Sequence, residues 1–560
     1  MEREYVVTLK DYSDLEEFYD DMETPGGNLY IPGRKVECAL RREISRNTHY
    51  MLTDEEAEEV GKDPRVLACE LLPKDRGIEA TPYWDYTANF EKSSTFTSND
   101  KNWGILRCVS GYSSGWGTDG GATTQKTGFR VRTTSSGKNV DVVIVDAHVN
   151  PNHLEFAKNP DGSGGGRVNA IDWFGLYKND VGVSTGNSYD YSSFSSNHGT
   201  HVAGTACGNT QGWARDANVY SIEFNYSGSP VAQWDLVVFD FIRAFHSKKP
   251  INSQTGRRNP TITNNSWGYS YNNISLSNVT SVTYRSNTVD LTGLTDEVKK
   301  LTLENMGVPV PYNTYLYRVP ARVSALDADI QDAINEGVIV VGSAGNSYWN
   351  CAVSSNQDYN NSIVVSGSTL YHSRGSSPSA ADNVICVGSI GTNHVEQKSN
   401  FSNWGSRVDT WAPGSNIISA VYNTSAASEF GITLRDDPRS STYKLGCISG
   451  TSMASPQVCG VLACLMEQEQ GLTQSQARIY LEQKARTLDD LKLQEPNIDW
   501  ANAGSKKSTQ SPYTSLSPDD HNRFLFVPKE RQLTGCTTPK YNHQRRPTSG
   551  CAYPRVRGKR

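Results

Sequence analysis

The chain has 560 residues, of which 36% are hydrophobic and 20% charged, and its formal net charge at pH 7 is −6. This length predicts one large domain with smaller additions. No apolar run approaches the ~20 residues that a membrane-spanning helix needs, and the 11 cysteines include no Cys-x-x-Cys pair of the kind that holds structural zinc.

The N-terminal sequence MEREYVVTLK carries charges where a secretory signal peptide has its apolar stretch. We therefore expect a cytoplasmic or virus-particle-associated protein rather than one secreted by the classical route. Residues 1–73 are acidic, with 18 acidic and 9 basic side chains.

Residues 1–73 are predicted to form a small α+β domain. REYVVTLK alternates like a strand, and in the following SDLEEFYDDME the pair Ser13 and Glu16 has the spacing of a capping box. Thr53 and Glu56 repeat that spacing in THYMLTDEEAEEV, and RVLACELL again has strand character. The order strand, helix, strand, helix, strand predicts an antiparallel sheet with helices on one face.

Residues 102–500 are predicted to form an α/β domain. Short apolar runs that end in small or polar residues predict buried strands: VDVVIVD (140–146), ANVYSIEF (217–224), PTITNNSWG (260–268), GVIVVGSAGN (337–346) and NVICVGSIG (383–391). Helical stretches such as WDLVVFDFIRAFHSK and LDADIQDAINEG lie between them. The alternation predicts a mainly parallel sheet flanked by helices, with functional residues at the carboxyl ends of the strands.

Two polar regions flank this domain. Residues 74–101 are polar and aperiodic and are predicted to be a linker. Residues 501–560 form a polar extension whose last part, 529–560, holds 9 basic and 1 acidic side chain. Such a tail can bind nucleic acid, but we expect a solvated tail or one docked on acidic protein surface.

A serine nucleophile needs a histidine base, a carboxylate that orients the histidine, and donors for the oxyanion. Ser452 is the candidate nucleophile, in ISGTSMASPQVCGVLACLM, where an apolar helix follows small residues. Pro456 predicts that the helix starts close to Ser452, with the proline in its first turn. The alternative is a serine that only caps the helix.

The other parts have candidates at strand ends and helix starts. His198 or His201, in SSNHGTHVAGTA, can supply the base, and the one at the mouth of the helix, His198, is the better placed. Asp146 ends the run VVIV, whereas Asp141 begins the same strand at its opposite end. Asn346 ends VIVVGSAGN and can donate to an oxyanion. The alternatives are structural histidines, a capping aspartate and a turn asparagine.

These motifs resemble a known family. NHGTHVAGT, SAGN and SGTSMASPQVCGV resemble the histidine, oxyanion and serine motifs of the subtilisin-like serine proteases, or subtilases, and the order Asp, His, Ser is that of subtilisin. The similarity covers about residues 102–490. It implies His198 as general base, Ser452 as nucleophile, Asp146 as orienting carboxylate and Asn346 as oxyanion donor, in a protease that acts on peptides or proteins.

The resemblance implies further roles. Ser266, Trp267 and Gly268, in NNSWG, would pair with the backbone of an extended peptide. Residues 1–73 resemble the ferredoxin-like propeptide domain of subtilases, which assists folding and inhibits the enzyme, so that self-cleavage is expected between about Leu72 and Asn102.

Some features depart from the family pattern. Ala147 and His148 replace the Ser or Thr and Gly that usually follow the aspartate, and His148 adds a titratable group near Asp146. The stretches from Trp267 to Asn346 and from Asn346 to VICVGSIG are longer than usual. These departures suggest a second hypothesis, a catalytically impaired subtilase scaffold with a structural or binding role, for example in a viral particle.

The two ends of the chain, one Gly-rich loop and the residue types at positions 198 and 346 support three further expectations. The charged N-terminus and the basic tail are similar to those of phage-encoded subtilases. No cofactor is required, and calcium, which is common in the family, has no assigned ligands here because NPDGSGGG (159–166) lacks a full ligand spacing. The related Ser-Glu-Asp peptidase type is not favoured, because His198 and Asn346 stand where that type has Glu and Asp.

Overall fold

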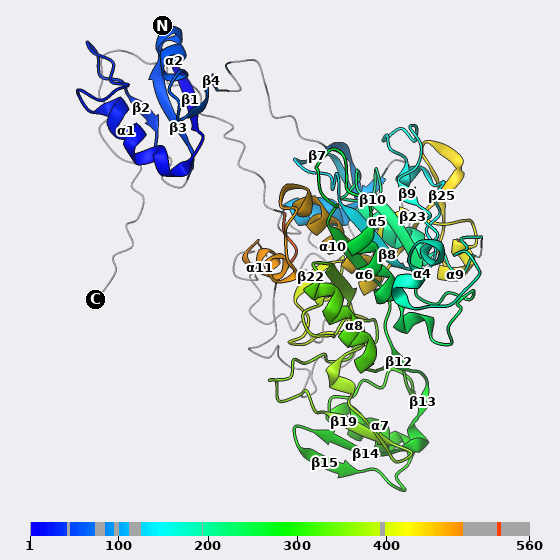
Figure 1. Ribbon diagram of the computed structural model, residues 1–560. Coiled ribbons are helices and arrows are strands. Elements are labelled where there is room, and N and C mark those ends of the chain that lie inside the picture. The colour runs from blue at the N-terminus through cyan, green and yellow to red at the C-terminus, as the bar shows by residue number, and fades with distance from the viewer. Residues whose placement is uncertain are drawn as a thin grey trace, which may run out of the picture. The chain divides into compact units, whose positions relative to one another are not determined.

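The computed structural model describes residues 2–41, 45–72, 75, 84–93, 100–110, 125–192, 194–392, 398–484 and 523–527. The chain divides into two compact units, Met1–Pro82 and Tyr83–Arg560, each described by itself below (Figure 1). Within the described residues, no helix combines the length and apolar character that crossing a membrane requires.

The unit Met1–Pro82 is a four-stranded antiparallel sheet with two helices. The strand order is β2-β3-β1-β4. The elements along the chain are β1 (Arg3–Leu9), α1 (Leu15–Glu23), β2 (Cys38–Leu40), β3 (Asn47–Leu52), α2 (Asp54–Val60) and β4 (Val66–Leu71). The predicted strands and helices are all present, and the short edge strand β2 is added to them. Val7, Leu9, Phe18 and Tyr50 are fully buried in a core of this unit's own.

The two predicted capping boxes have different outcomes. At α2 the box forms, because the Thr53 amide donates to Glu56 (2.8 Å) and the Glu56 amide donates to the Thr53 hydroxyl (3.3 Å). At α1 the prediction is wrong. Asp11 accepts from both the amide and the hydroxyl of Ser13 (2.9 and 2.7 Å), which makes a 3₁₀ turn before α1 begins at Leu15.

The unit Tyr83–Arg560 is built on a seven-stranded sheet in which every neighbouring pair is parallel, in the order β22-β21-β18-β11-β8-β10-β9. Its strands are β8 (Asp141–Asp146), β9 (Val168–Asn169), β10 (Asn218–Glu223), β11 (Thr261–Asn265), β18 (Ile339–Ser343), β21 (Ile385–Ile390) and β22 (Thr410–Pro413). The five strands expected from the apolar runs are confirmed as β8, β10, β11, β18 and β21.

Helices cover both faces of this sheet, so the unit has three layers (Figure 1). Along β8, Val142 and Ile144 pack into one apolar cluster and Val143 and Val145 into another, as the two-residue period of a strand requires. The first cluster contains α3 (Trp103–Ser110), α5 (His198–Cys207), α10 (Thr451–Gln468) and α11 (Gln474–Lys484). The second contains α4 (Trp173–Val181), α6 (Val238–Lys248) and α8 (Ser324–Asn335). The predicted α/β class is therefore confirmed.

The two unusually long stretches on either side of Asn346 fold together into one subdomain. Its sheet has the order β15-β14-β19-β20, so β14 from the first stretch pairs with β19 from the second. A separate apolar core includes Leu276, Val282, Leu303 and Trp349. The elements are β12 (Ser270–Tyr271), β13 (Ile274–Ser275), β14 (Val279–Tyr284), β15 (Asn287–Asp290), α7 (Asp296–Asn305), β16 (Tyr315–Leu316), β17 (Val319–Pro320), β19 (Ser362–Val365) and β20 (Ser368–Leu370).

Two three-stranded sheets also belong to the unit. One has the order β23-β25-β24, from β23 (Ile417–Ala420), β24 (Arg435–Asp437) and β25 (Ser440–Ile448), with the short helix α9 (Ala426–Phe430) between β23 and β24. The other joins β5 (Trp84–Glu91) to β6 (Asp100–Asn102) and β7 (Gln125–Thr133). Residues 84–93 were expected to be linker, yet Phe90 is fully buried in the main core and the side-chain amide of Asn416 donates to the Lys92 carbonyl (3.0 Å).

A short segment of the C-terminal extension lies along the outer edge of the large sheet. The Trp411 amide donates to the Arg523 carbonyl (2.7 Å), and the Leu525 amide donates back to the Trp411 carbonyl (2.8 Å). Phe524 is 1% exposed and packs in the main core. Residues 523–527 therefore cover the edge strand β22, and the rest of the predicted extension lies outside the described residues.

Candidate active site

Asp146 and His198 meet at the carboxyl end of β8. Asp146 is the last residue of that fully buried strand, and its Oδ1 accepts from the Ala147 amide (2.8 Å). His198 is the first residue of α5, and its Nδ1 lies 2.8 Å from Oδ1 and 3.0 Å from Oδ2 of Asp146. The carboxylate therefore fixes the ring so that Nδ1 carries the proton and Nε2 is free to accept one.

The environment of His198 favours the charged imidazolium. Removal from water lowers the pKa of His198, but the charge of Asp146, its hydrogen bond and the charge of Glu429 outweigh that effect and raise the pKa above its ordinary value. The His198 side chain keeps 26% of its surface exposed, against 2% for that of Asp146. A reacting group can thus reach the imidazole while the carboxylate stays covered.

Small residues bring α5 close to the end of β8 and to β23. A Cβ atom at Gly199 would overlap the Ala147 carbonyl oxygen, and one at Gly204 would overlap the Ser419 hydroxyl. This close approach places the first residue of the helix within hydrogen-bond distance of the strand end.

His201, one turn further along α5, has a different environment. It is fully buried, and its Nε2 donates to the carbonyls of Ile417 (3.0 Å) and Gly446 (3.2 Å). Burial lowers the pKa of His201 to about 3. A neutral imidazole that joins α5 to β23 and β25 is a structural part of the site.

Ser452 is the second residue of α10. Its hydroxyl donates to the Ser266 carbonyl (3.3 Å), and the Ser266 hydroxyl donates to the Ser452 carbonyl (3.0 Å). Within the described residues, no hydrogen bond joins Ser452 to His198. Since catalytic hydrogen bonds in free enzymes are often long or absent, this arrangement does not remove Ser452 from the site.

Pro456 lies inside α10, in the second turn rather than the first turn that was predicted. A proline has no amide hydrogen, so it cannot donate to the carbonyl four residues earlier, which is that of Ser452. The Ser266 hydroxyl takes the place of that donor. The Ser266 hydroxyl thus compensates for the missing helical bond and joins α10 to the end of β11 at Ser452.

Asn346 is oriented by Thr451, a residue that the sequence analysis did not single out. Its Oδ1 accepts from the amide and the hydroxyl of Thr451 (both 2.8 Å), and the Gly345 amide donates to the same hydroxyl (3.1 Å). The Nδ2 of Asn346 lies beside Gly450 and donates to no protein acceptor among the described residues. An amide donor next to the start of α10 is thus left unoccupied.

The predicted peptide-binding segment is partly occupied. Trp267 stacks flat on Phe224, with ring centroids 4.7 Å apart, and Gly268 is exposed. Tyr269 is already paired, because its amide donates to Ser377 (3.0 Å) and its carbonyl accepts from Ala321 (3.2 Å). Of the three predicted residues, Ser266 is buried and its carbonyl accepts from the Ser452 hydroxyl (3.3 Å), whereas Gly268 is exposed.

His148 lies away from the pair formed by Asp146 and His198. Its Nε2 is 3.2 Å from the Tyr189 hydroxyl, and its ring lies 5.0 Å from that of Tyr191. It is buried beside the rings of Tyr189, Tyr191 and Tyr226. The ring of His148 therefore belongs to an aromatic cluster, although the residue is close in sequence to Asp146.

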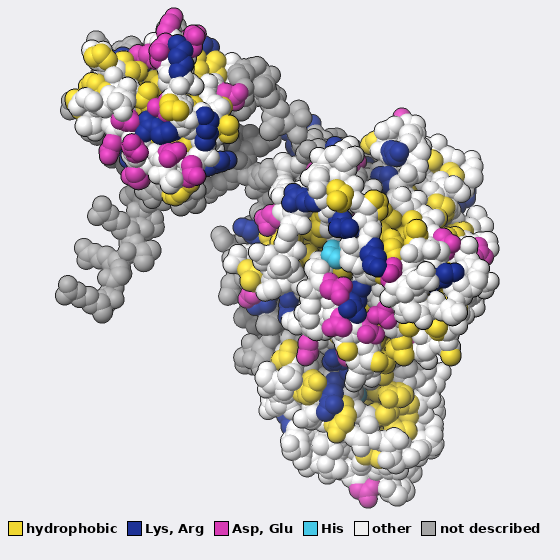
Figure 2. All heavy atoms as spheres, viewed as in Figure 1, with side chains coloured by type: hydrophobic (Ala, Val, Ile, Leu, Met, Phe, Trp, Pro, Cys, Tyr) yellow, Lys and Arg dark blue, Asp and Glu magenta, His cyan; other side chains and the backbone are white. Residues whose placement is uncertain are grey.

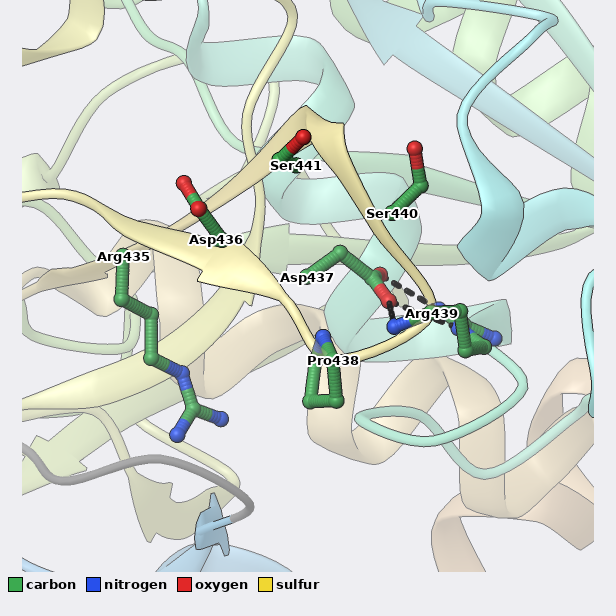
Figure 3. Close-up of a pocket in the computed structure, with 7 residues that line it drawn as sticks. All are labelled: Arg435, Asp436, Asp437, Pro438, Arg439, Ser440 and Ser441. Carbon is green, nitrogen blue, oxygen red and sulfur yellow. Dashed lines mark hydrogen bonds and ion pairs between the residues drawn. The ribbon is translucent and has the colours of Figure 1, made fainter.

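Two further regions carry possible ligand groups. In NPDGSGGG, the Asp161 carboxylate accepts from the amide and hydroxyl of Ser163 (2.8 and 2.7 Å) and closes a local turn. A cavity of about 450 Å³ at the hairpin of β24 and β25 is lined by Arg435, Asp436, Asp437, Pro438, Arg439, Ser440 and Ser441 (Figure 3). Its Arg439 is paired with Asp437 and with buried Glu155, and none of the candidate site residues lines it.

The visible surface carries mixed charge. On the face shown in Figure 2, basic and acidic side chains of the unit Tyr83–Arg560 are interspersed.

Among the described residues, no group of three or more His, Cys, Asp or Glu side chains is placed to hold a metal ion.

The sequence is similar to those of known proteins. The model of the subtilase family, peptidase family S8, matches residues 137–499. Alkaline serine exoprotease A of Vibrio alginolyticus is 26% identical over 352 residues, which are 63% of this chain and 43% of that protein. The alkaline proteinase of Hapsidospora chrysogena is 35% identical over 168 residues, 28% of this chain and 36% of the relative. The chain thus spans less than half the length of these relatives.

A solved structure is also similar. A cold-adapted subtilisin-like serine proteinase aligns over 76% of this chain and 97% of its own, with 22% identity and a TM-score of 0.42.

Proposed function

The chain belongs to the subtilase family, and we propose that it is a serine endopeptidase that cleaves peptide bonds with Ser452, His198 and Asp146. The observation that carries the proposal is the bond between His198 Nδ1 and Asp146 (2.8 Å) at the carboxyl end of β8. It leaves Nε2 of His198, at the N-terminus of α5, as the free base.

In the proposed reaction, the Ser452 hydroxyl turns from the Ser266 carbonyl to His198. Nε2 then takes the hydroxyl proton while Oγ attacks the carbonyl carbon of the peptide. The resulting oxyanion accepts from Asn346 Nδ2 and from the Ser452 amide at the positive end of α10. His198 passes its proton to the leaving amine. Water then attacks the acyl-enzyme while His198 Nε2 takes one of its protons, and His198 returns that proton to Ser452 Oγ as the bond to the acyl group breaks.

The proposed substrate is an extended segment of a peptide or protein. It would add a strand beside Ser266, Trp267 and Gly268 and bond with their backbone groups. The paired state of Tyr269 supports a short contact there, ending at Gly268.

We also propose that the enzyme is made as a zymogen. Residues 1–73 would act as the propeptide and intramolecular inhibitor, removed by self-cleavage between Leu72 and Asn102. The separate apolar core of the unit Met1–Pro82 supports a segment that folds and detaches as one piece. Residues 73–74, 76–83 and 94–99 of the expected cleavage region lie outside the described residues.

A second candidate function is a non-catalytic subtilase scaffold. The bond from the Ser452 hydroxyl to the Ser266 carbonyl favours it, since a hydroxyl held there is not directed at His198. The two candidates differ in whether Ser452 reacts as a nucleophile.

The test compares wild type with Ser452→Ala. In wild type we expect labelling of Ser452 by a fluorophosphonate and loss of an N-terminal piece over time, both read by intact mass. The alanine variant should do neither, and its turnover of labelled casein should fall by about 10⁴–10⁶-fold. Ser441→Ala, an exposed serine on β25, is the matched control and should behave as wild type. A folded wild type that is never labelled supports the scaffold instead.

A further inference from the structure

The residues just before α5 are held by a helix from a distant part of the chain. Glu429, on α9, accepts from the Asn197 amide (3.1 Å), from the Asn197 side-chain amide (2.7 Å) and from the Ser196 hydroxyl. Asn197 is the residue that precedes His198, so one exposed carboxylate gathers three donors at the entrance to the histidine helix.

Other contacts join the same two segments. The Asn423 amide donates to Asn197 Oδ1 (2.8 Å), and Asn197 Nδ2 also donates to the Ser425 hydroxyl (2.9 Å). The rings of Phe194 and Tyr422 lie 5.0 Å apart. Every polar atom of the Asn197 side chain is therefore bound to the loop that carries α9.

The hydrogen bonds lead from Glu429 to the backbone of His198. The His198 amide donates to the Ser196 hydroxyl (3.0 Å), and that hydroxyl in turn donates to Glu429. The first amides of a helix have no partner within the helix, and a negative charge near them is favourable. Glu429 thus serves the start of α5 as a cap supplied by another part of the chain.

We propose that Glu429 is a positioning residue for His198, which fixes the first turn of α5 through Ser196 and Asn197 and adds a second negative charge near the imidazole. The inference rests on the proposed function, because it concerns how the base of that reaction is held. Glu429 itself touches no reacting atom, so its effect passes through His198.

The charged groups that face His198 determine the sign of the effect. Asp146 faces it from β8 and Glu429 from α9, while His201 on α5 is neutral. Desolvation lowers the pKa of His198, and both carboxylates raise it. Since the reaction needs the neutral base, loss of the Glu429 charge should move the acid limb of the rate profile to lower pH.

The test follows the rate of fluorophosphonate labelling of Ser452 against pH in full-length Glu429→Gln and Glu429→Ala. In Glu429→Gln we expect the acid limb to shift down by a few tenths of a pH unit, and the shift to shrink in 1 M salt because this carboxylate is exposed. Glu429→Ala should show the same shift and, in addition, a several-fold lower plateau, because the bonds to Ser196 and Asn197 are also lost.

Glu297→Gln, an exposed glutamate on α7, is the control and should match wild type. The inference is overturned if both Glu429 variants label with the wild-type profile. If Glu429→Ala does not fold, the glutamine variant still decides the matter. If wild type is labelled at Ser452 but both Glu429 variants keep the wild-type pH profile, the proposed function stands without this inference. If wild type is never labelled, both fall.

Discussion

Strand β8 has a buried aspartate at each end, and the two ends differ in what surrounds them. Asp141 and Asp146 are each 1% exposed. Asp141 accepts from Lys249 Nζ (2.8 Å) and from the side-chain amides of Asn218 (2.8 Å) and Asn259 (2.9 Å). Asp146 instead faces His198, whose protonation can change. Burial of a carboxylate therefore does not identify a site, whereas the chemistry of its partner does.

The largest expected effect separates the two aspartates. Asp146→Asn should lower kcat/KM by about 10⁴-fold, because an amide can hold His198 with the proton on the wrong nitrogen. Asp141→Asn should lower the free energy of unfolding by about 3–5 kcal/mol, since it leaves buried Lys249 without its counter-charge. Urea unfolding and kcat/KM, corrected for the folded fraction, give both quantities for each variant.

The different roles of the two aspartates would be contradicted if Asp141→Asn reduced kcat/KM per folded molecule as strongly as Asp146→Asn does. A fully active Asp146→Asn would contradict them as well.

A middle-sized effect separates the two histidines of α5. The pKa of His201 is about 3 in the fold and about 6.5 in an unfolded chain. The unfolded state therefore binds more protons between these values, and the stability that neutral His201 provides is complete above about pH 6.5 and falls as the pH falls. His201→Gln should reduce the loss of unfolding free energy between pH 7 and pH 4.5 by about 2–3 kcal/mol relative to wild type.

His198 should behave with the opposite sign. Its pKa is raised in the fold, so it contributes stability below its unfolded pKa that is lost as the pH rises through its folded pKa. In urea unfolding at several pH values, His198→Gln should therefore weaken the protein more at acid than at alkaline pH. Equal pH dependence in the two variants would contradict the different environments assigned to these histidines.

The smallest expected effect concerns the serine end of the site. Ser266→Ala should lower the free energy of unfolding by about 1 kcal/mol, because the Ser452 carbonyl loses its donor. In a Pro456→Ala background the restored helical amide can serve that carbonyl, so the same change should cost less, with a coupling of about 0.5–1 kcal/mol. A double-mutant cycle in urea measures it, and strict additivity would show that the two donors do not share the carbonyl.

Much of the fold and of the site followed from the sequence for a physical reason. Strands buried on both faces must be nearly continuous apolar runs, so β8, β10, β11, β18 and β21 were visible as such. Parallel strands end at one edge, which brought Asp146 and Asn346 to the same side of the sheet. The position of His198 at the start of the predicted helix indicated which of the two histidines lies beside the end of β8.

Other features depended on contacts that are distant in sequence. β14 and β19 pair across the Asn346 loop, and neither stretch alone shows that the other completes its sheet. Pro456 was expected in the first turn of α10 but lies in the second. The sequence around it does not reveal that the hydroxyl of the distant Ser266 replaces the lost donor. Glu429 is separated by 232 residues from Asn197, and no local pattern pointed to it.

The docked segment 523–527 has a consequence for how molecules of this protein meet one another. An uncovered edge strand offers unpaired amides and carbonyls to any second chain that presents the same groups. Here the Trp411 amide and carbonyl of β22 are already taken by Arg523 and Leu525 of the same chain. The segment thus covers this part of β22 with backbone hydrogen bonds, so that these two groups are not available to a second chain.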